Sequence, residues 1–135
     1  MFRKMGFPGQ YLQGPGALQQ LGPLLRSMGW RRPVALCDAV VAGKVWPLAS
    51  DGLTAAGLQA SQLTFPGECT RGAIEQLAVQ ARAFDADVVV GLGGGKAIDA
   101  AKGVSLALDV PVVVCPTIAS NDAPLELLSA PSPAA

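Results

Sequence analysis

The sequence predicts an α/β fold in which helices flank both faces of a parallel β-sheet. Short apolar segments rich in valine alternate with amphipathic stretches of about 10–15 residues, which is typical of repeated β–α units with right-handed crossovers. Half of the residues are hydrophobic and only 15% are charged, which favours a sheet that is covered on both faces. The length of 135 residues is that of one domain.

The first helix is expected after Gly14-Pro15-Gly16, where leucines recur at spacings of three and four residues. Gly29 ends this pattern. Pro23 lies inside it, and proline interrupts the hydrogen bonding of a helix interior. We therefore expect either a kink or a later start of the helix near Gly22-Pro23.

Pro33 to Cys37 is predicted to form a short buried strand that ends at Asp38. From Ala39 to about Gly57 the apolar spacing is again helical, but Pro47 and Ser50-Asp51-Gly52 interrupt it. This region is therefore expected to form two short helices or one helix with a break.

A weak second strand is predicted from Gln62 to Phe65, followed by the turn Pro66-Gly67-Glu68. Thr70 can then cap a helix that runs to about Phe84, because its hydroxyl can accept a hydrogen bond from a backbone N–H of the first turn. Apolar residues line one face of this helix.

The third strand is expected from Ala86 to Gly91, and a glycine turn leads from it into a helix that ends near Leu108. Pro111 to Cys115 is predicted as the fourth strand, and residues 116–124 as a loop. Residues 125–135 shift towards proline, serine and alanine, which predicts a loose tail with neither a strand nor a long helix.

Charge and residue usage exclude several functions. Ten acidic and ten basic residues leave no net charge, so nucleic acid is not an expected partner. Three widely spaced cysteines indicate neither a disulfide framework nor a zinc knuckle and favour a reducing cytoplasm. We see no signal peptide or membrane span and expect a soluble protein. Histidine, the commonest metal ligand and neutral-pH acid–base group, is absent.

The glycine turn is the strongest candidate for a ligand site. Gly93, Gly94 and Gly95 join a buried strand to a helix, where free N–H groups and the helix dipole favour an anion, and Lys96 adds a positive charge. A phosphate site is therefore predicted, although a tight connection without a ligand has the same glycine pattern. The Walker motif and the usual G-x-G-x-x-G are both absent, which disfavours a nucleotide triphosphatase.

Other polar residues follow neighbouring strands and should lie at the same carboxyl edge as the glycine turn. Asp38 can accept hydrogen bonds from a ribose hydroxyl, or it can cap the helix that begins at Ala39. Thr117, Ser120 and Asp122 follow the fourth strand and are also ordinary loop residues.

Two segments carry a resemblance to a known family: Gly91-Leu-Gly-Gly-Gly-Lys-Ala-Ile-Asp-Ala-Ala-Lys102 and Pro116-Thr-Ile-Ala-Ser-Asn-Asp-Ala-Pro124. Together they resemble the glycerol dehydrogenase branch of the metal-dependent, iron-containing alcohol dehydrogenases. Pro8-Gly-Gln-Tyr-Leu-Gln-Gly14 and Gly67-Glu-Cys-Thr-Arg71 agree. The resemblance implies that residues 1–124 form a Rossmann-like NAD-binding domain.

The resemblance also implies roles for individual residues. NAD would contact Asp38 through its adenosine ribose, and a polyol substrate would contact Asp122. The remaining cofactor contacts are Gly94, Gly95 and Lys96 at the pyrophosphate, and Thr117 and Ser120 deeper in the site. The family transfers a hydride between nicotinamide and a secondary alcohol, whose oxygen is polarised by a divalent metal, zinc or iron.

In the family, one aspartate and two histidines of a helical C-terminal domain hold this metal, and the full-length enzymes are homo-oligomers. Because this chain has no histidine and departs from the family pattern at Leu125-Glu126, we expect a cofactor-binding portion that binds no metal and is inactive alone. The alternatives are a stand-alone nucleotide-binding module and a fragment of a dehydroquinate synthase or glycerol-phosphate dehydrogenase type enzyme. Lys96 and the polyol-type loop count against the last of these.

Overall fold

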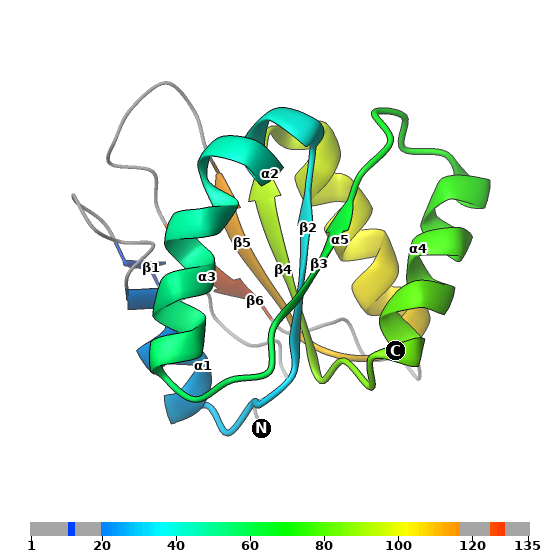
Figure 1. Ribbon diagram of the computed structural model, residues 1–135. Coiled ribbons are helices and arrows are strands. Elements are labelled where there is room, and N and C mark those ends of the chain that lie inside the picture. Colours follow the sequence, from blue (N-terminus) through cyan, green and yellow to red (C-terminus); the bar gives the residue numbers. More distant parts are fainter. Residues whose placement is uncertain (1–10, 13–19, 117–124, 129–135) are drawn as a thin grey trace.

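The computed structural model describes residues 11–12, 20–116 and 125–128 (Figure 1). Its strands are β1 (Tyr11–Leu12), β2 (Pro33–Cys37), β3 (Ser61–Thr64), β4 (Val88–Gly93), β5 (Val112–Pro116) and β6 (Leu125–Leu128). Its helices are α1 (Leu21–Ser27), α2 (Ala39–Lys44), α3 (Trp46–Ala55), α4 (Arg71–Ala83) and α5 (Gly95–Leu108).

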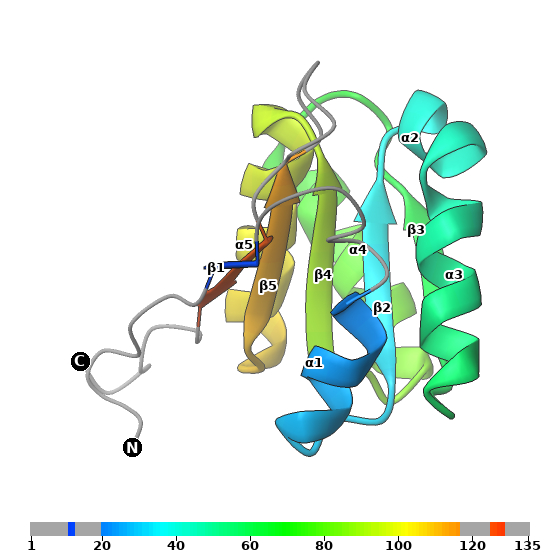
Figure 2. The same ribbon diagram turned by 90° about the vertical axis from the view of Figure 1, so that its left-hand side faces the viewer.

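The strands form one sheet in the order β1-β6-β5-β4-β2-β3. β2, β3, β4 and β5 are parallel to one another, whereas β6 pairs antiparallel with β5 and β1 antiparallel with β6. Figure 2 shows β2, β4 and β5 running side by side with their carboxyl ends together. The predicted α/β fold with a Rossmann-like parallel sheet is therefore confirmed.

Helices cover both faces of the sheet. α1, α2 and α3 contribute to the core on one face, and α4 and α5 to the core on the other (Figure 1). All six residues of β4 are buried, as expected for a strand in the middle of a covered parallel sheet. Gly91 permits this packing, because a Cβ atom there would lie 2.8 Å from the Cβ of Ala101 in α5.

The two prolines that interrupted the helical patterns both lie in first turns. α1 begins at Leu21, so Pro23 causes a late start rather than a kink. Residues 39–55 form the two short helices α2 and α3, and Pro47 is in the first turn of α3. A proline is tolerated there because the first N–H groups of a helix have no partner within it.

The prediction that no strand follows residue 124 was wrong. Leu125–Leu128 forms β6, with Val112 opposite Leu128 and Val114 opposite Glu126. The two-residue strand β1 was not predicted and pairs with β6. β6 satisfies backbone groups at the edge of β5, and β1 satisfies those at the edge of β6. This gain depends on the pairing of the strands rather than on local composition. None of the described helices is long and apolar enough to cross a membrane.

Candidate functional site

The candidate site lies at the carboxyl edge of the sheet, between β2 and β4. These two strands are neighbours, but the chain continues from β2 to β3 on one side and from β4 to β5 on the other. This reversal makes their carboxyl ends the switch point at which open α/β sheets bind ligands. Cys37 is paired with Leu92, so Asp38 and Gly93 follow at the same level of the two strands.

Gly93 is required at the end of β4 for two reasons. Its φ angle of +144° is strained for residues that carry a side chain. A Cβ atom there would also lie 3.1 Å from the Cβ of Ala97 and 3.6 Å from Oδ2 of Asp38. The sequence indicated a glycine turn, but it could not show that this turn approaches Asp38, because the approach depends on the pairing of β2 with β4.

Gly94 and Gly95 lie at the start of α5. Both are exposed, and a Cβ atom on either would meet no atom of the described residues within 4 Å. Gly94 is the N-cap residue and has no capping side chain, and its carbonyl accepts the N–H of Ile98 at 3.0 Å. The first N–H groups of a helix have no partner within it, so those of α5 can bind an anion such as a diphosphate.

Lys96 is the second residue of α5, and its side chain is exposed. Among the described residues, its ammonium group forms no ion pair. A side chain at this position can reach an anion bound in front of the first turn. The turn and the lysine can thus hold an anion such as a phosphate or diphosphate.

Asp38 is the N-cap residue of α2, which confirms one of its two predicted roles. Its Oδ1 accepts the N–H of Val41 at 2.8 Å. No described residue donates a hydrogen bond to Oδ2, the oxygen nearest to Gly93. Asp38 can therefore cap α2 and still accept a hydrogen bond from a ligand. The backbone N–H of Val41 holds the carboxylate in place. The sequence indicated that Asp38 could cap this helix, but not which N–H group would donate.

Cys37 and Cys115 are the buried thiols nearest to this edge. Burial and the neighbouring Asp38 carboxylate raise the pKa of Cys37 to about 12, although Gln62 opposes part of the rise. Burial alone raises the pKa of Cys115 to about 12. Both thiols are therefore neutral at pH 7 and are poor nucleophiles. The described residues contain no group of three or more His, Cys, Asp or Glu side chains that could hold a metal ion.

The structure thus brings four predicted site residues, Asp38, Gly94, Gly95 and Lys96, to one edge of the sheet. The other three, Thr117, Ser120 and Asp122, lie outside the described residues.

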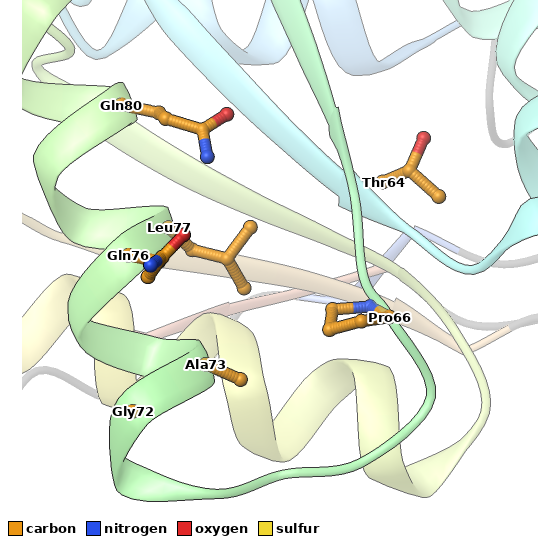
Figure 3. Close-up of a pocket in the computed structure, with 7 residues that line it drawn as sticks. All are labelled: Thr64, Pro66, Gly72, Ala73, Gln76, Leu77 and Gln80. Carbon is orange, nitrogen blue, oxygen red and sulfur yellow. The ribbon is translucent and has the colours of Figure 1, made fainter.

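A separate pocket of about 430 Å³ lies between β3 and α4 (Figure 3). It is lined by Thr64, Pro66, Gly72, Ala73, Gln76, Leu77 and Gln80. None of these is a predicted site residue, and the pocket does not include the glycine turn.

Residues 8–130 match the family of iron-containing alcohol dehydrogenases. The match extends to residue 130, past Leu125, where we expected the departure from the family pattern to begin. The chain is 40% identical over 131 residues to glycerol dehydrogenase of Pseudomonas putida, covering 96% of this chain and 35% of that protein. It is 37% identical over 122 residues to glycolaldehyde reductase of Halobacterium salinarum, covering 90% and 33%.

The fold is also similar to the crystal structure of glycerol dehydrogenase from Schizosaccharomyces pombe. The TM-score is 0.72 at 28% identity, over 78% of this chain and 27% of that one. The chain therefore spans about a third of the length of the curated relatives that it matches.

Proposed function

The chain belongs to the iron-containing alcohol dehydrogenase family, and we propose that it is the NAD-binding, N-terminal portion of a glycerol dehydrogenase. The observation that carries this proposal is the glycine turn of β4–α5 facing Asp38 across the switch point of the sheet. Relatives named glycerol dehydrogenase, 35–41% identical to this chain, support the choice of branch.

Each part of the site has a role in this proposal. The first N–H groups of α5 and the Lys96 ammonium bind the pyrophosphate, which approaches closely because Gly94 and Gly95 have no side chains. Asp38 accepts a hydrogen bond from the adenosine ribose through Oδ2. Thr117 and Ser120 contact the nicotinamide half, and Asp122 contacts the polyol. These three residues follow β5, which neighbours β4 in the sheet.

When bound, NAD supplies the hydride acceptor for the oxidation of glycerol to dihydroxyacetone. The described residues of this chain bind and orient the cofactor at the carboxyl edge. They contain no donor set that fits the catalytic metal of the family, and the chain has no histidine. We therefore assign cofactor binding to this chain and expect no turnover from it alone.

Lys96→Ala tests the proposal directly. One charge-assisted hydrogen bond to a phosphate contributes about 1.5–3 kcal/mol, so the variant should bind NAD and ADP-ribose about tenfold or more weakly in calorimetry. Lys102→Ala is the matched control, because Lys102 is also exposed and lies about 9 Å further along α5. The proposal fails if the folded wild-type chain binds neither ligand at millimolar concentration. An unchanged affinity of Lys96→Ala would remove the lysine from the site.

A further inference from the structure

The Asp38 carboxylate is held beside the turn that is proposed to bind phosphate. Its Oδ1 is fixed by the 2.8 Å hydrogen bond from Val41 N–H. Its Oδ2 lies 3.6 Å from the position that a Cβ of Gly93 would occupy, and Gly94, the next residue, begins the anion-binding turn. The carboxylate cannot move away from this turn without losing its hydrogen bond to α2.

An anion in front of α5 therefore meets charges of both signs. Lys96 contributes one positive charge and the helix N-terminus about half of one. Asp38 contributes a negative charge on the side of β2. Asp99, an exposed residue one turn along α5, adds a second negative charge nearby. The carboxylates repel any anion bound there, and this repulsion is greater for a ligand that carries an additional negative charge.

We infer that Asp38 makes this site select a diphosphate that is esterified at both ends, as in ADP-ribose, over one that ends in a free phosphate, as in ADP. The inference rests on the proposed function and specifies its ligand class. ADP-ribose carries one negative charge on each phosphate, whereas the terminal phosphate of ADP carries nearly two at pH 7.5. Both ligands present the same adenosine ribose to Asp38, so a hydrogen bond to that ribose affects both affinities. The terminal charge is what distinguishes them.

Asp38→Asn separates the two effects. The asparagine oxygen still caps α2, because asparagine is as good an N-cap residue as aspartate, but the negative charge is lost. We expect the dissociation constant of ADP, divided by that of ADP-ribose, to fall about tenfold in the variant, because the additional charge of ADP is no longer repelled by a carboxylate. Calorimetry on the 135-residue chain at pH 7.5 and low salt measures both constants.

Asp109→Asn is the control, because it removes the same charge at the opposite end of α5. Asp109 has left-handed backbone angles, which asparagine also adopts readily. Its ratio should equal that of the wild type. If the wild type binds ADP-ribose and Asp38→Asn leaves the ratio unchanged, the inference is overturned while the proposed function stands. If the folded wild type does not bind ADP-ribose, both are overturned.

Discussion

At the scale of single residues, Asp87 links the segment that precedes β4 to the segment that precedes β2. Its carboxylate accepts the N–H of Arg31 at 2.7 Å and that of Arg32 at 2.9 Å, and its own N–H donates to the carbonyl of Arg32 at 3.1 Å. Asp85, two residues earlier, contacts the Arg32 guanidinium at 3.4 Å, where both side chains are largely exposed. Hydrogen bonds to a carboxylate are stronger than an exposed ion pair.

Asp87→Asn should therefore lower the free energy of unfolding by about 1–3 kcal/mol, because an amide can accept only one of the two N–H groups well. Asp85→Asn makes the same chemical change and should cost about 0.5 kcal/mol or less. Asparagine also suits the φ of +56° at position 85. Urea denaturation of both variants measures the difference. Equal losses in the two variants would show that the two hydrogen bonds accepted by Asp87 stabilise the fold no more than the exposed ion pair of Asp85 does.

At the scale of elements, α1 crosses α3 at a position where only glycine fits. A Cβ atom on Gly22 would overlap the carbonyl oxygen of Gly52 and approach the Cβ of Ala56 to 3.0 Å. Gly43 in α2 is different, because a Cβ atom there would meet none of the described residues within 4 Å. Its backbone φ is also in the ordinary negative range.

These two glycines predict opposite results for the same substitution. Gly22→Ala should destabilise the chain by about 1–3 kcal/mol, since the backbone of α3 must move. Gly43→Ala should stabilise it by about 0.5–1 kcal/mol through helix propensity. Thermal unfolding followed by circular dichroism gives both values. A stabilising Gly22→Ala would mean that α1 and α3 are not packed as closely as described.

At the scale of the whole molecule, the two buried thiols make stability depend on pH. The pKa of each rises from 9.0 in the unfolded chain to about 12 in the folded one. Above pH 9 the unfolded chain therefore loses these protons while the folded chain keeps them. Their contribution to stability is complete below pH 9 and is lost as the pH rises towards 12.

Between pH 8 and pH 10, Cys115 should account for a loss of about 1.4 kcal/mol in the free energy of unfolding. Cys115→Ala should remove that part of the slope, whereas Cys69→Ala, at an exposed thiol, should leave it unchanged. Urea denaturation at both pH values, with a reductant present, tests this prediction. A wild-type slope in Cys115→Ala would contradict the assigned burial.

The sequence alone determined the features that depend on neighbouring residues. The four parallel strands, the interruption of the helical pattern in residues 39–57, the cap at Thr70 and the placement of Lys96 on the first turn of α5 all follow from local patterns. The sequence left open whether residues 39–57 form one helix or two, and whether Asp38 caps a helix. Each is a matter of periodicity, turn chemistry or capping, which act over a few residues.

The tertiary structure decided what depends on strand pairing. It placed β6 against β5, which the composition of residues 125–135 did not indicate. It also brought Oδ2 of Asp38 next to Gly93, which is 55 positions later in the chain. The physical reason is that the edge of a strand and the Asp38 carboxylate meet their partners only when the sheet is assembled. The sequence of either segment alone therefore does not predict the energy of the contact.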